Sequence, residues 1–138
     1  MIITVDGAVT VENKGLVFIK RTKAPFQDTF VLPGGHVEES DETLLDACVR
    51  ELEEEIGLVV PASRLRQLIV LNRVGADPRY ARRMSVVFHV DITQVEARSL
   101  TAGSDAATLE VVDFRALEPH EVGFDHFDAV EAVRERLA

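Results

Sequence analysis

The chain has 138 residues, of which 46% are hydrophobic and 28% are charged, and its formal net charge is −9. This length predicts a single domain, residues 1–138, with a substantial core, and the composition is typical of globular proteins. The negative charge argues against nucleic-acid binding, which normally needs a basic surface, and no apolar run is long enough to span a membrane.

The single cysteine and the first residues of the chain favour a cytoplasmic location. Cys48 has no second cysteine for an intrachain disulfide, and a reducing compartment is the default for such a chain. Residues 1–11 lack the basic start of a signal peptide, and Asp6 interrupts their apolar run. We therefore expect a cytoplasmic protein without a membrane segment.

Most of the chain predicts strands. Residues 2–11 predict a strand that breaks near Gly7, and a hairpin turn follows at 12–15. Further stretches rich in β-branched and apolar residues predict strands at 16–21, 29–32, 36–38, 66–74, 84–92 and 109–114. Residues 33–35, with Gly34 and Gly35, predict a turn, and residues 94–107 predict a long loop.

Two segments predict helices, one in mid-chain and one at the end. Residues 42–56 and 124–137 both carry apolar side chains at steps of three and four. Ser40 or Asp41 is expected to cap the first helix, and Gly57 is expected to end it. Strands with two separated helices predict an α/β (α+β) fold, in which a mixed sheet carries a helix on each face.

The mid-chain helix carries a cluster of acidic side chains. Glu51, Glu54 and Glu55 can share the side opposite its apolar stripe. Like charges at this spacing repel, and only Arg50 relieves them. Clustered carboxylates beside a Gly-Gly turn offer the oxygen ligands that a hard divalent cation prefers. The segment therefore predicts a metal site that could bridge to substrate phosphates.

Residues 35–58 resemble the Nudix box, G-x5-E-x7-R-E-U-x-E-E-x-G-U, in which U is aliphatic. Every fixed position from Glu42 onward is matched, whereas six residues instead of five separate Gly35 from Glu42. We interpret the difference as one extra residue in the loop before the helix, where insertions are tolerated. The resemblance covers nearly the whole chain and implies an α/β/α sandwich.

The resemblance also implies an activity and the residues that carry it. Nudix hydrolases cleave a nucleoside diphosphate linked to another group, using Mg2+ or, as a substitute, Mn2+. Arg50 would hold the carboxylates in place, and Glu51, Glu54 and Glu55 would be catalytic. The implied metal ligands are the carbonyl of Gly35 and the carboxylates of Glu42, Glu51, Glu54 and Glu55.

Other contacts are expected from outside the box. Asp105 and Glu110, with Glu96 as a third candidate, could supply a general base or a further metal ligand. An arginine-rich segment could reach the substrate, because guanidinium groups match phosphate geometry and an exposed aromatic ring can stack on a base. The candidates there are Arg73, Arg79, Tyr80 and Arg82.

The segments APFQDTFVLPGGHVE, DPRYARRMSVVFHVD, AGSDAATLEVVDF and GFDH are similar to the short ADP-ribose pyrophosphatase branch. We therefore expect a nucleotide substrate, ADP-ribose or a sugar nucleotide. Two alternatives stay open: a nucleoside triphosphate pyrophosphohydrolase that removes damaged nucleotides, and a non-catalytic ADP-ribose sensor. The resemblance also implies a homodimer, which is common among relatives.

Overall fold

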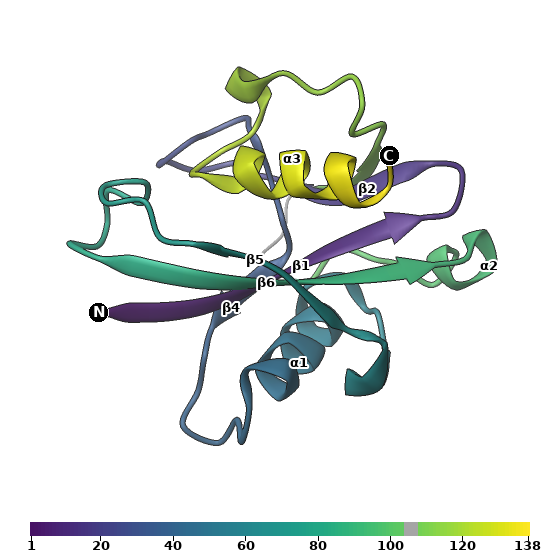
Figure 1. The fold of residues 1–138 in the computed structure, drawn as a ribbon, viewed down its shortest axis with the longest axis horizontal. Helices are drawn as coiled ribbons and strands as arrows, with labels where there is room; N and C mark the ends of the chain where they lie inside the picture. Colours follow the sequence, from purple (N-terminus) through teal and green to yellow (C-terminus); the bar gives the residue numbers. More distant parts are fainter. Residues whose placement is uncertain (104–107) are drawn as a thin grey trace.

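A mixed β-sheet lies between two helices, α1 (Leu44–Ile56) and α3 (His126–Arg136), in the computed structural model of the protein, which describes residues 1–103 and 108–138 (Figure 1). The sheet order is β3-β2-β1-β6-β5, with β4 paired to β1 and β7 paired to β2. The strands are β1 (Ile2–Val11), β2 (Gly15–Lys20), β3 (Phe30–Val31), β4 (Gly34–His36), β5 (Arg66–Leu71), β6 (Arg83–Ile92) and β7 (Thr108–Val112). The expected α/β/α sandwich is confirmed.

The centre of the sheet is a parallel pair, β1 with β6, whose register runs from Ile2 opposite Arg83 to Val11 opposite Ile92. The other strand pairs are antiparallel. Because both faces of this pair are covered, its side chains are buried alternately under the two helices. Val9 belongs to the cluster under α1, whereas its neighbour Ala8 belongs to the cluster under α3.

Helix α1 begins two residues later than predicted, and neither Ser40 nor Asp41 caps it. Thr43 is the N-cap, and its hydroxyl accepts the backbone N–H of Asp46 at 3.0 Å. Thr43 has the extended backbone that this position requires, directly before the first helical residue. Gly57 ends the helix as expected, with φ of 69°, in the left-handed region that glycine adopts without a steric penalty.

Several strand boundaries also differ from the sequence predictions. β1 does not break at Gly7, which instead leaves room for Leu52 of α1, since a Cβ there would lie 2.5 Å from Leu52 Cδ2. Gly34 and Gly35, expected to form only a turn, belong to β4 because they pair with β1. The first residues of the expected 94–107 loop form a short helix, α2 (Gln94–Ala97).

Two 3-10 turns, Ala62–Arg64 and Pro119–Glu121, complete the described elements. Among residues 1–103 and 108–138, no helix has the length and apolar character needed to cross a bilayer.

Candidate active site

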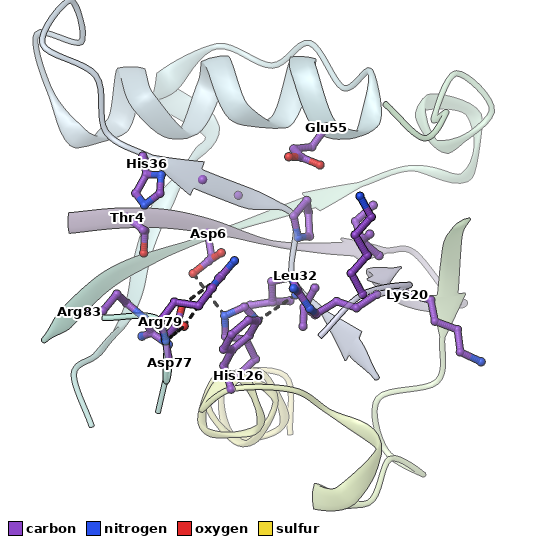
Figure 2. A pocket seen from close by; sticks show the side chains of 18 of the residues that line it. Thr4, Asp6, Lys20, Leu32, His36, Glu55, Asp77, Arg79, Arg83 and His126 are labelled. Atoms are coloured by element: carbon purple, nitrogen blue, oxygen red, sulfur yellow. Dashed lines mark hydrogen bonds and ion pairs between the residues drawn. The ribbon is translucent and has the colours of Figure 1, made fainter. Parts of the chain in front are cut away.

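A cavity of about 590 Å3 opens beside the Gly34-Gly35 strand, between the two helical layers. Figure 2 shows Glu55 entering from the α1 side and His126 lying on the opposite side, near α3. Charged side chains dominate the polar part of its wall: Asp6, Lys20, Arg21, Lys23, Glu55, Asp77, Arg79 and Arg83. A recess of this size with several convergent polar groups is suited to a small-molecule ligand.

Gly35 lies directly against the carboxylate of Glu51. Pairing with β1 places Gly35 opposite Val5 in the sheet, so the sheet fixes its backbone. A Cβ on Gly35 would lie 2.6 Å from Glu51 Oε1 and 2.7 Å from Oε2. The glycine is therefore required by close approach of a carboxylate, and its backbone lies next to one of the predicted metal ligands.

Replacing Gly35 by Ala is expected to lower kcat/KM about tenfold, because the new methyl group must push the Glu51 carboxylate away. The effect on folding should be smaller, since the obstructed atoms are the end of one side chain. Steady-state kinetics over a range of Mg2+ concentrations, together with urea unfolding, would check this. Unchanged kinetics would contradict the close contact of Gly35 with Glu51.

Arg50 joins two of the predicted ligands. Its Nη1 donates to Glu51 Oε1 at 2.9 Å and to Glu54 Oε2 at 3.2 Å. Because a single nitrogen contacts both carboxylates, the two groups converge on one point. Arg50 therefore holds these two carboxylates together, as the resemblance implies.

The carboxylates and the guanidinium influence each other's ionisation. Burial raises the pKa of Glu51, and the hydrogen bond from Arg50 opposes this shift. Hydrogen bonding to Asp41 raises the pKa of Arg50 further above its already high value. Glu51 is thus a buried carboxylate whose charged form depends on a neighbouring cation.

The donor set fits a hard divalent cation. Glu51 and Glu54 supply carboxylate oxygens that already meet at one positive atom, and Gly35 supplies a backbone beside them. Within residues 1–103 and 108–138, no group of three or more Asp, Glu, His or Cys side chains surrounds a common point as a preformed site. Arg50 occupies the position between the two carboxylates instead.

The remaining box glutamates lie in different surroundings. Glu55 lines the cavity. Glu42 is exposed in the loop before α1. Glu53, at the variable position of the box, is exposed on α1.

Two of the four residues predicted to contact the substrate line the cavity, Arg79 and Tyr80. Asp77 accepts from Nε and Nη2 of Arg79 at 3.0 and 2.8 Å, and the guanidinium lies 5.5 Å from the rings of both Tyr80 and Phe124. Arg79 is thus held against two aromatic rings at the edge of the cavity.

The other two residues predicted to contact the substrate, Arg73 and Arg82, do not line the cavity. Arg73 forms an ion pair of 2.7 Å with Asp128 of α3, in a separate surface groove, and Arg82 is exposed.

The candidate bases are similarly scattered. Glu96 pairs with Arg64 at 2.6 Å and caps α2, and Glu110 is exposed on β7. Asp105 lies outside the described residues. The structure therefore brings neither Glu96 nor Glu110 to the cavity wall.

Among the cavity residues to which the sequence assigned no role, Asp6 and His126 lie beside each other. Asp6 is buried, accepts a hydrogen bond from Ser85 and lies 3.6 Å from Nε2 of His126. His126 Nδ1 accepts the backbone N–H of Leu32 at 3.0 Å, and burial lowers the pKa of His126, so the neutral imidazole is favoured. The GFDH segment contains His126, but a lone histidine carries no signal for this contact.

Comparison with known proteins identifies the family. A family model described as NUDIX domain matches residues 2–135. An ADP-ribose pyrophosphatase from Methanocaldococcus jannaschii is 40% identical over 124 residues, which are 90% of this chain and 68% of the relative.

Solved structures are similar over the whole chain. The NUDIX domain of Shewanella oneidensis NrtR, complexed with ADP ribose, has a TM-score of 0.84 at 22% identity and covers 100% of this chain and 89% of that one. A MutT/nudix family protein from Enterococcus faecalis has a TM-score of 0.83 at 25% identity, covering 99% of this chain, which spans 61% of that protein.

A third structure holds a nucleotide and a metal. It is a bifunctional NMN adenylyltransferase/ADP ribose pyrophosphatase from Francisella tularensis, complexed with AMP and a Mn ion. Its TM-score is 0.78 at 24% identity, and the match covers 99% of this chain and 42% of that one. Together with the box and its geometry, these matches show that the chain belongs to the Nudix family and is a hydrolase acting on pyrophosphate bonds.

Proposed function

We propose that this protein hydrolyses ADP-ribose, or a closely related sugar nucleotide, into two monophosphates with the help of Mg2+. The observation that carries the substrate assignment is the 40% identity to an ADP-ribose pyrophosphatase over 90% of the chain. The cavity beside Gly35 supports it, because Gly35 and Glu55 of the box line it together with guanidinium groups and aromatic rings that suit a nucleotide.

Glu51, Glu54 and the carbonyl of Gly35 would hold the cation. When bound, Mg2+ would neutralise phosphate charge and lower the pKa of a coordinated water. Arg50 holds Glu51 and Glu54 together, and the same two carboxylates would supply oxygen ligands to the cation. Glu55, which lines the cavity, would accept a proton from water on the substrate side.

The opposite part of the cavity would orient the nucleotide. Arg79 would meet a phosphate from its place at the cavity edge, where two hydrogen bonds to the buried Asp77 orient a guanidinium whose side chain is 47% exposed. Tyr80 and Phe124 lie beside Arg79 and offer faces for a base or a ribose.

We also propose that residues 1–138 act as one domain in the cytoplasm. Cys48 is consistent with this, because it is the single cysteine of the chain and therefore forms no intrachain disulfide. The homodimer that the resemblance implies stays a prediction.

Incubation with ADP-ribose and Mg2+ should yield AMP and ribose 5-phosphate, identified by mass spectrometry. EDTA should lower the rate at least about a hundredfold, because the cation supplies several kcal/mol of charge stabilisation, and excess Mg2+ or Mn2+ should restore it. Release of inorganic pyrophosphate from nucleoside triphosphates, without turnover of ADP-ribose, would instead support the triphosphate alternative. Binding of ADP-ribose without any product would support the sensor.

A further inference from the structure

The loop between β4 and α1 has one residue more than the Nudix pattern, and it places a carboxylate against Arg50. Asp41 Oδ1 accepts from Arg50 Nε at 3.1 Å, and Oδ2 accepts from Nη2 at 2.8 Å. Oδ2 also accepts the backbone N–H of Glu38 at 2.8 Å, which closes the loop around the pair. The side chain of Asp41 is only 6% exposed, so water competes little for this contact.

Arg50 therefore has two edges with different partners. Nη1 faces Glu51 and Glu54, and the more distant Glu38 lies 3.4 Å from the same atom. Nε and Nη2 face Asp41, and Nη2 also donates to the carbonyl of His36 at 3.0 Å. Since a guanidinium is planar and rigid, holding one edge fixes the direction of the other.

The two edges would behave differently when a divalent cation binds. A cation held by Glu51 and Glu54 takes over the partners of Nη1, and two positive charges then lie close together. The repulsion is tolerable only if Arg50 keeps a negative partner elsewhere. Asp41 is that partner, and none of the contacts described above ties it to the cation ligands.

We propose that Asp41 is a positioning residue for the metal site, anchoring Arg50 so that Glu51 and Glu54 can pass from the guanidinium to a divalent cation. This inference rests on the proposed function, because it assumes that a cation binds at the box. Without Asp41, the charge of Arg50 would be balanced by Glu51, Glu54 and the exposed Glu38, and Arg50 would compete with the cation for Glu51 and Glu54.

The test measures Mn2+ binding to the purified chain by electron paramagnetic resonance of free Mn2+, so its readout does not depend on turnover. Asp41→Asn is expected to weaken Mn2+ binding about tenfold, the size of effect seen when an outer partner of metal ligands is lost. Asp41→Glu, which keeps the charge, should recover at least part of the affinity. Glu39→Gln is the matched control, because it removes one exposed charge from the same loop and should leave binding within about twofold.

Urea unfolding of the same variants separates positioning from folding. An unfolding midpoint of Asp41→Asn close to that of Glu39→Gln, combined with weaker Mn2+ binding, would support the inference. Equal Mn2+ affinity in Asp41→Asn and the unmodified chain would overturn it and leave the proposed function intact. If the unmodified chain bound no Mn2+, the metal part of the proposed function would fall together with the inference.

Discussion

Replacing Glu54 by Gln is expected to lower kcat for ADP-ribose by at least about a hundredfold, with little effect on stability. The amide keeps the size of the side chain but removes the negative charge that a hard cation prefers. A metal-supplied stabilisation of several kcal/mol corresponds to at least two powers of ten in rate. Stability should change little, because the Glu54 side chain is 57% exposed and its contact with Arg50 is a surface pair.

Glu53→Gln is the matched control for this substitution. Glu53 is the preceding residue of α1, is exposed, and loses the same charge when it is replaced by Gln. We expect its kcat to stay within about twofold of the unmodified protein, because a surface charge outside the site contributes little. The rate of each variant would be measured against Mg2+ concentration. Equal rates for Glu54→Gln and Glu53→Gln on every substrate tested would remove Glu54 from the metal site.

The layered fold could be predicted because it depends on periodic patterns. Strand alternation and the apolar stripe of residues 42–56 are local properties, and they recur in the two buried clusters on either side of the sheet. The boundaries were less accurate where a tertiary contact decides them. Gly34 and Gly35 suggest only a turn, yet pairing with β1 makes them a strand.

The box predicted only some of the residues that contact Arg50. Fixed spacing on one helix brings Glu51 and Glu54 together, so helical geometry was sufficient for them. Asp41 was expected to cap the helix, because a carboxylate near a helix start usually does so. Its contact with Arg50 depends on the path of the lengthened loop, which follows no periodic pattern.

The arginines show where charge alone is uninformative. Arg73 and Arg79 lie in one basic segment, but Arg73 pairs with Asp128, which is 55 positions away in the chain. Arg79 instead lies at the cavity, held by Asp77 at a separation of two. Only the three-dimensional arrangement separates a residue that can meet the substrate from one that balances surface charge.

Replacing Asp125 by Ala is expected to lower the free energy of unfolding by about 3–5 kcal/mol, because it leaves a buried guanidinium without its charged partner. Arg83 Nη2 lies 2.7 Å from Asp125 Oδ1, and the two side chains are 6% and 2% exposed. The second contact of Arg83, from Nη1 to the carbonyl of Leu71 at 3.4 Å, is too long to compensate. Urea unfolding would measure the loss.

Asp128→Ala is the control, since it removes an aspartate only three positions further along whose partner, Arg73, is 70% exposed. Asp128→Ala should lower the free energy of unfolding much less, because exposed ion pairs contribute little. Equal losses for the two variants would show that the Arg83–Asp125 pair is effectively solvated.

The Arg83–Asp125 pair also supports the cavity wall, so removing Asp125 should disturb the position of the neighbouring cavity residues. Asp125 precedes His126, whose Nδ1 holds the backbone of Leu32 just before the Gly34-Gly35 strand. A double variant, Arg83→Met with Asp125→Ala, removes both charges and should recover much of the stability, since an apolar replacement of a buried pair is often neutral. If the double variant were as unstable as Asp125→Ala alone, the instability would come from lost packing, and the uncompensated charge of Arg83 would not be its cause.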